Sequence, residues 1–159
     1  ESLQFNKRGK AKEKRNRRVD FRMKVHHIGY AVRSIEGAVR QFEILGFRCE
    51  GKIVLDNSRK VRILFMTDDT HRIELIEPNE NGSRIDNILK KGGSSPYQIC
   101  YESEDIENDT KLLKQSGFTT ISNISPAPAL ENKKVCFLYS KDVGIIELVE
   151  ENHQLRNWE

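Results

Sequence analysis

The chain has 159 residues, 36% of them hydrophobic, which is enough to bury the core of one domain. No apolar run approaches the length of a membrane span, so we expect no membrane partner. The net charge of +3 comes from residues 1–22, which hold nine Lys/Arg; the rest of the chain carries 18 basic and 21 acidic residues, which argues against a nucleic-acid partner.

Residues 1–22 form a basic extension ahead of the first periodic segment. One interpretation is a disordered arm that binds nucleic acid or a membrane surface. The interpretation that we favour is an upstream extension, natural or artificial, that stands outside the fold. We therefore place a single domain at residues 23–151, followed by a C-terminal tail at residues 152–159.

The first predicted module, residues 24–78, has the order strand, helix and three strands. Its helix is indicated by Ser34, a suitable N-cap, and by apolar residues at helical spacing as far as Gly46. Its strands are indicated by β-rich apolar runs between turn residues. They are expected at residues 25–32, 47–55, 61–67 and 72–77.

A short helix at residues 83–91 is predicted to link this module to the next. Ser83 and Asp86 suggest a capping box at its start, and Gly92 and Gly93 suggest its end.

The second module, residues 96–151, repeats the plan of the first. Its helix is expected to begin after Asp105 and to end near Ser116. A proline-containing loop at residues 125–128 is predicted to cover the site. The strands are expected at residues 97–102, 118–124, 135–140 and 144–150.

The two modules are related by a sequence repeat. Residues 27–30 (His-Ile-Gly-Tyr) match residues 98–101 (Gln-Ile-Cys-Tyr) at an offset of 71. After a two-residue insertion, Glu74 matches Glu147. Two copies are too few for a solenoid, so the repeat predicts one closed, pseudo-symmetric domain.

The strongest functional signal is the pair Glu74 and Glu147. Each lies between apolar residues in a predicted strand, so its side chain is expected to point into a covered interior. An ionised carboxylate is costly there unless a cation or hydrogen bonds compensate it. Two such carboxylates therefore suggest a shared metal ion.

With these motifs the chain resembles the vicinal oxygen chelate superfamily, and within it most closely the methylmalonyl-CoA epimerases, with glyoxalase I next. The resemblance implies an α+β fold of paired βαβββ modules that form a cupped mixed β-sheet around one divalent metal ion. It also implies the ligands His27, Glu74, Gln98 and Glu147. The matching segments are 26–32 (HHIGYAV), 45–47 (LGF), 73–78 (IELIEP), 105–107 (DIE), 133–138 (KKVCFL) and 146–150 (IELVE).

Gln98 departs from the epimerase pattern, which usually has a histidine at this position. A glutamine carbonyl is a legitimate ligand for a hard or borderline cation. Replacing an imidazole by an amide should weaken metal affinity and shift the preference from zinc or nickel toward harder metals. The identity of the metal stays open among cobalt, nickel, zinc, manganese and magnesium.

The expected reaction follows from the ligand charges. Two carboxylates neutralise a divalent ion and leave positions for substrate oxygens, so the ion can act as a Lewis acid. By resemblance, Glu147 is the base that moves a proton at the carbon next to a thioester carbonyl, and Glu74 is its symmetric partner. We identify no second base outside this set.

Three functions remain open, and the first is favoured: an epimerase of a CoA thioester. The second is a glyoxalase-type lyase acting on a thiol hemithioacetal, and the third is a metal-free small-molecule binding or resistance protein. A homodimer with a small-molecule substrate is expected.

The remaining candidates receive structural interpretations. His26 and the rim residues Glu77 and Glu150 are expected to lie off the site. Basic residues at positions 59, 60, 133 and 134 either hold CoA phosphates or are solvated. The odd number of cysteines, Cys49, Cys100 and Cys136, predicts reduced, buried thiols in a cytoplasmic protein.

Overall fold

In the computed structural model, which describes residues 23–151, nine strands form one mixed sheet and three α-helices flank it. The predicted basic extension at residues 1–22 and the tail at residues 152–159 lie outside the described residues. The predicted α+β architecture is confirmed. Within the described part of the chain, every helix is too short or too polar to cross a membrane.

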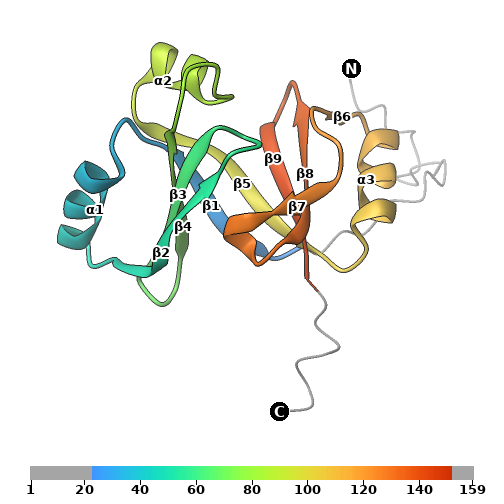
Figure 1. Ribbon diagram of the computed structural model, residues 1–159. Helices are drawn as coiled ribbons and strands as arrows, with labels where there is room; N and C mark the ends of the chain where they lie inside the picture. The colour runs from blue at the N-terminus through green and yellow to red at the C-terminus, as the bar shows by residue number, and fades with distance from the viewer. Residues whose placement is uncertain (1–22, 152–159) are drawn as a thin grey trace, which may run out of the picture.

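The strands and helices follow the predicted order of the two modules (Figure 1). The first module contains β1 (Val25–Ala31), α1 (Ile35–Ile44), β2 (Arg48–Asp56), β3 (Val61–Thr67) and β4 (Arg72–Pro78). The linking helix is α2 (Asp86–Gly92). The second module contains β5 (Ser95–Ser103), α3 (Ile106–Gln115), β6 (Thr119–Thr120), β7 (Ser125–Ala127), the 3-10 turn η1 (Pro128–Leu130), β8 (Lys133–Ser140) and β9 (Gly144–Glu150).

The two modules join at the centre of the sheet. The strand order is β2-β3-β4-β1-β5-β9-β8-β6, with β7 also paired to β8. Strands β1 and β5 are antiparallel to each other, whereas each is parallel to the last strand of its own module, β4 or β9. Residues at matching positions in the two modules therefore lie symmetrically about the β1–β5 pair, in neighbouring strands at the centre of the sheet.

N-cap side chains fix the starts of α1 and α3. The hydroxyl of Ser34 accepts the N–H of Gly37, and the carboxylate of Asp105 accepts the N–H of Asn108. These are the predicted N-caps, and each satisfies one of the free N–H groups in the first turn.

Glu77 and Glu150 add a second cap to the same helices. Glu77 accepts the N–H of Ile35, the first residue of α1, and Glu150 accepts the N–H of Ile106, the first residue of α3. Neither glutamate is among the residues that line the cavity beside the candidate site. Their role is to attach each helix to the last strand of its module.

The prediction for residues 118–128 was wrong. The expected strand 118–124 is ordered as a strand only at β6, and the expected loop begins with a second strand, β7, in which Ser125 pairs with Val135 of β8. The cause is a local hydrogen bond: the N–H of Phe137 donates to the hydroxyl of Ser122, where a strand would offer a backbone carbonyl. The matching strand in the first module, β2, has a register shift between Glu50 and Val54.

Two smaller predictions also need correction. Helix α2 begins at Asp86 and not at Ser83, because the Asp86 carboxylate accepts the N–H of Gly82 and holds the preceding residues in a turn. No capping box forms. Cys49 is exposed, since β2 is the edge strand of the sheet, whereas Cys100 and Cys136 are buried as expected.

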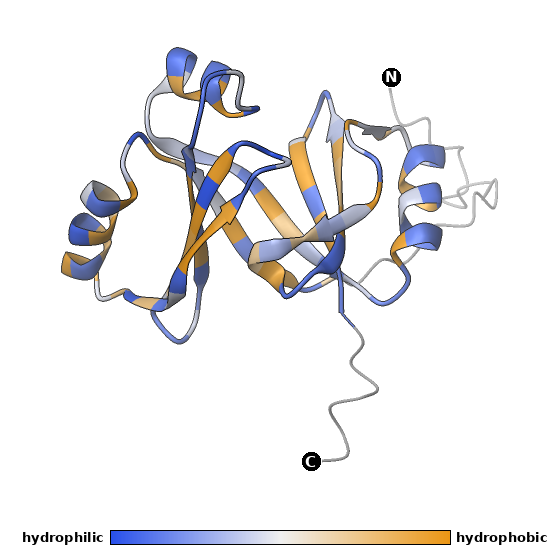
Figure 2. Ribbon diagram, in the orientation of Figure 1, coloured by the Kyte–Doolittle hydropathy of each residue, from blue (hydrophilic) through white to orange (hydrophobic). Residues whose placement is uncertain are grey.

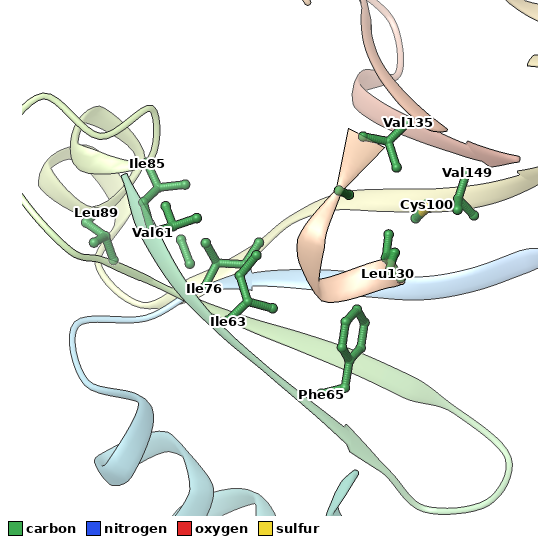
Figure 3. Packing of buried hydrophobic residues seen from close by; sticks show 12 residues of the cluster. Val61, Ile63, Phe65, Ile76, Ile85, Leu89, Cys100, Leu130, Val135 and Val149 are labelled. Atoms are coloured by element: carbon green, nitrogen blue, oxygen red, sulfur yellow. The ribbon is translucent and has the colours of Figure 1, made fainter. Parts of the chain in front are cut away.

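Apolar side chains divide into three clusters along the sheet. Ile35 of α1 and Ile106 of α3 lie in the two outer clusters, and the helices turn their polar faces outward (Figure 2). The third cluster lies between the modules, where Val61, Ile63 and Ile76 of the first module face the linking helix and Leu130 lies on η1 (Figure 3). This central cluster forms the apolar surroundings of the candidate site.

Candidate functional site

The four predicted site residues come from four neighbouring strands at the centre of the sheet. His27 lies on β1, Glu74 on β4, Gln98 on β5 and Glu147 on β9. Their exposed fractions are 1%, 4%, 4% and 3%, respectively. The strand order β4-β1-β5-β9 brings them together from the two modules, as the repeat predicts.

Their polar atoms converge on a small region. The Nε2 atom of His27 lies 2.8 Å from Oε2 of Glu74 and 3.3 Å from Oε2 of Glu147. The amide of Gln98 donates a hydrogen bond of 3.0 Å to the same oxygen of Glu147. One ligand atom each of His27, Glu74 and Glu147 lies within 4.8 Å of the others, a spacing that allows all three to contact one ion.

Hydrogen bonding within the described residues leaves part of this cluster unsatisfied. Oε1 of Gln98 is buried without a hydrogen-bond partner, and Nε2 of His27 and Oε2 of Glu74 are buried and form no well-directed hydrogen bond although they lie 2.8 Å apart. Unpaired buried polar atoms are costly, and three of them point to a missing partner. Because two are oxygens and the third is an imidazole nitrogen, a divalent cation fits this donor set.

Electrostatics make the cluster a place where protons and a cation compete. Burial raises the pKa of the Glu147 carboxyl; contact with His27 opposes this shift and the charge of Glu74 adds to it. Burial lowers the pKa of His27, but the neighbouring carboxylates of Glu74 and Glu147 outweigh this effect, so the pKa lies well above 6.5. A metal ion would displace the proton that the cluster otherwise holds.

His26 contacts His27 but is not one of the four predicted site residues. Its Nδ1 lies 2.8 Å from Nδ1 of His27, and its Nε2 lies 3.3 Å from the Arg72 guanidinium. Burial, with the charges of His27 and Arg72, lowers the His26 pKa to about 4, so this imidazole is neutral near pH 7. The ring of His27 also packs edge-on against Phe65. These contacts hold the imidazole of His27 in one orientation.

Gly29 is a site residue that the sequence interpretation missed. It pairs with Gln98 across the β1–β5 ladder, and a β-carbon there would lie 2.5 Å from Cγ of Gln98. Glycine therefore leaves the space in which the Gln98 side chain lies. A glycine inside a strand is the signal that could have revealed this close approach.

Tyr97 is a second residue that was missed. The β1–β5 register shifts where Gly29 pairs with Gln98 and Tyr30 pairs with Pro96, which leaves Tyr97 as an extra residue. The bulge lets the consecutive residues Tyr97 and Gln98 both line the same cavity, which regular alternation would prevent.

The cavity beside the cluster is mostly apolar and has a volume of about 180 Å³. Glu74, Gln98 and Glu147 contribute polar groups to its wall, and apolar side chains of the central cluster form most of the rest. A second possible ligand group, His26, His27 and Cys100, shares only His27 with the first, and neither His26 nor Cys100 lines the cavity. Burial also raises the pKa of the Cys100 thiol well above 9.0, so the thiol stays neutral.

Of the segment predicted to cover the site, residues 125–128, Ala127 lines this cavity, and Ala129 and Leu130 of the adjoining η1 line it as well. Arg59 holds this segment against the first module, because its guanidinium donates to the carbonyl of Pro126 and to the hydroxyl of Ser125. The cover is therefore a fixed strand and turn.

Three of the four basic residues considered for CoA phosphates are paired with carboxylates. Arg59 pairs with Asp56 at 2.7 Å, a contact that also explains the burial of this aspartate. Lys133 pairs with Glu151 and Lys134 with Glu107. These ion pairs favour the structural interpretation of the three residues.

The fold and the paired modules define a class of protein. The chain belongs to the glyoxalase/bleomycin resistance protein/dioxygenase superfamily, whose family model matches residues 26–137. The ethylmalonyl-CoA/methylmalonyl-CoA epimerase of Cereibacter sphaeroides is 31% identical over 129 residues, covering 79% of this chain and 96% of the relative. The resemblance recognised from the sequence motifs is confirmed.

Solved structures give the same fold. A hypothetical protein from Bacillus halodurans C-125 superposes with a TM-score of 0.73 at 28% identity, covering 82% of this chain and 96% of the other. Methylmalonyl-CoA epimerase from Mycobacterium tuberculosis superposes with a TM-score of 0.71 at 22% identity, covering 83% and 90%. At that identity the second likeness supports the fold alone.

Proposed function

We propose that the protein is a divalent-metal-dependent isomerase that moves a proton at the carbon next to the thioester carbonyl of an acyl-CoA, as a methylmalonyl-CoA epimerase does. The observation that carries this proposal is the convergence of two buried carboxylates, an imidazole and an amide at an apolar cavity. The epimerase relative, 96% of whose length is matched by this chain, supports the choice of substrate class.

His27, Glu74, Gln98 and Glu147 would hold the ion. When bound there, a divalent ion supplies Lewis-acid polarisation of the thioester carbonyl, which acidifies the neighbouring C–H. Two carboxylates balance its charge, so the occupied site is close to neutral within its apolar surroundings.

Proton transfer is assigned to the two carboxylates. An apolar site raises the pKa of a carboxyl group and makes its carboxylate a stronger base, which is the direction given for Glu147. Glu74 lies on β4 and Glu147 on β9, on opposite sides of the central β1–β5 pair. Epimerisation requires proton removal on one face of the carbon and return on the other. In the proposed reaction, Glu74 would serve one face and Glu147 the other.

The test is exchange of the α-hydrogen of methylmalonyl-CoA in deuterated solvent, with the protein loaded with Co²⁺. We expect deuterium incorporation and racemisation, and loss of both in Glu147→Gln. The glyoxalase interpretation replaces this one if no acyl-CoA exchanges while methylglyoxal and a small thiol give a hydroxyacyl thioester. Absence of both reactions and of bound metal would instead favour a binding protein.

The homodimer and the cytoplasmic location stay predictions. Size-exclusion chromatography with light scattering on the full chain tests the first.

A further inference from the structure

The guanidinium of Arg84 lines the same cavity as the carboxylate pair. Arg84 precedes α2 and lies between two buried residues, Ser83 and Ile85, so its backbone is anchored although the residue itself is exposed. Its Cζ lies 5.2 Å from the ring centre of Phe137, which also lines the cavity. This stacking directs the positive charge over the cavity wall.

The position of Phe137 places this charge near the site. Phe137 on β8 is paired directly with Glu147 on β9, and side chains of such pairs are neighbours on the sheet. Tyr97 lines the same cavity as Arg84 and Glu147. Arg84 therefore lines the cavity together with the candidate metal ligands Glu74 and Glu147. The phosphates of a bound CoA would lie at the far end of the long pantetheine arm.

Arg84 is also available for an anion. Of the two arginines that line the cavity, Arg59 is paired with Asp56. Within residues 23–151, no carboxylate lies within ion-pair distance of Arg84. A metal ion would be neutralised by Glu74 and Glu147, so a substrate carboxylate entering this apolar cavity needs a further positive group.

We propose that Arg84 binds the free carboxylate of the acyl group and makes the site selective for CoA thioesters of 2-substituted malonic acids. This inference rests on the proposed function for its substrate class. Arg84 acts as a specificity-determining residue, and a planar guanidinium with paired donors suits a carboxylate better than a single ammonium does. The phenol of Tyr97 offers another donor on the same side.

Equilibrium binding tests the proposal without depending on turnover. The Co²⁺-loaded protein is titrated calorimetrically with methylmalonyl-CoA and with propionyl-CoA, which differ only in the acyl carboxylate. We expect the wild type to prefer methylmalonyl-CoA. Loss of a charged hydrogen-bond pair in Arg84→Met should weaken methylmalonyl-CoA binding by about 10- to 100-fold and change propionyl-CoA binding by less than about two-fold.

Two variants control for unrelated effects. Arg84→Lys keeps the charge and should recover part of the preference. Arg40→Met removes an exposed arginine on α1, away from the cavity, and should leave both affinities unchanged. Circular dichroism and thermal unfolding confirm that each variant is folded before titration.

Several results would overturn the inference. Equal weakening of the binding of both thioesters in Arg84→Met would assign Arg84 to the CoA phosphates. If the affinity for neither thioester changes, or if the wild type binds neither, Arg84 has no role in binding the acyl carboxylate. The proposed function fails separately: an Arg84-dependent preference without any α-hydrogen exchange would leave Arg84 as a carboxylate-binding residue in a protein that is not an isomerase.

Discussion

A β-carbon added to Gly29 would lie 2.5 Å from Cγ of Gln98, the residue with which it pairs across the centre of the sheet. Contacts this short require one side to move. Gln98 is buried and donates to Glu147, so moving its side chain disturbs the carboxylate as well.

Gly29→Ala should therefore weaken divalent-metal binding, by about 10-fold, by displacing the Gln98 amide. Isothermal titration with Co²⁺ measures the effect. Gly37→Ala is the matched control, because the β-carbon in α1 meets nothing closer than 3.4 Å and the position is remote from the site. Equal metal affinity in the wild type and Gly29→Ala would contradict the assignment of Gln98 to the ligand set.

Gln98→His should change metal preference. An imidazole favours borderline metals more strongly than an amide does, so affinity for Zn²⁺ or Ni²⁺ should rise by about 10-fold while affinity for Mg²⁺ stays the same or falls. Competition titrations with the two kinds of metal give the ratio. An unchanged ratio would mean that the side chain at position 98 does not contact the ion.

The buried carboxyl group of Asp56 should make the free energy of unfolding depend on pH. Burial raises the pKa of this carboxyl, but hydrogen bonds from Arg59 and Ser58 outweigh burial and hold the pKa below 3.8. A carboxyl with a lowered folded-state pKa stabilises the fold above its unfolded pKa. That stabilisation is lost as the pH falls from about 4 through the lower folded-state value.

Asp56→Asn should lower the free energy of unfolding at pH 7 by about 1–3 kcal/mol, because charged hydrogen bonds within a buried group are lost. Its stability should also fall less steeply below about pH 4 than that of the wild type. Urea unfolding at several pH values measures both effects. Asp69→Asn serves as control, since the Arg48–Asp69 pair is exposed and should contribute little. A parallel pH profile in the wild type and Asp56→Asn would refute this account.

The repeat explains why most of the fold and the four clustered residues could be predicted. The sequence repeat makes His27 equivalent to Gln98 and Glu74 equivalent to Glu147. Because the strands that carry them, β4, β1, β5 and β9, are neighbours about the pseudo-symmetric centre, the four residues converge. Their apolar neighbours in the sequence then indicated burial, which the structure bears out.

The missed features depend on single contacts that a periodic pattern does not contain. The break between β6 and β7 follows from the Ser122 hydroxyl bond to Phe137, and the exposure of Cys49 follows from the edge position of β2. The entry of Tyr97 into the cavity follows from a register shift. Each requires knowledge of which strands are neighbours and in what register.

The central claim, that His27, Glu74, Gln98 and Glu147 hold one divalent ion, is tested most directly by metal stoichiometry. Protein purified without a metal-affinity step is stripped, reloaded with Co²⁺, dialysed and subjected to elemental analysis, together with Glu74→Gln and the control Glu77→Gln. We expect about one ion per chain in the wild type and the control, and a clear loss in Glu74→Gln, which removes one of the two neutralising charges. Full occupancy in Glu74→Gln, or no metal in the wild type, would contradict the account.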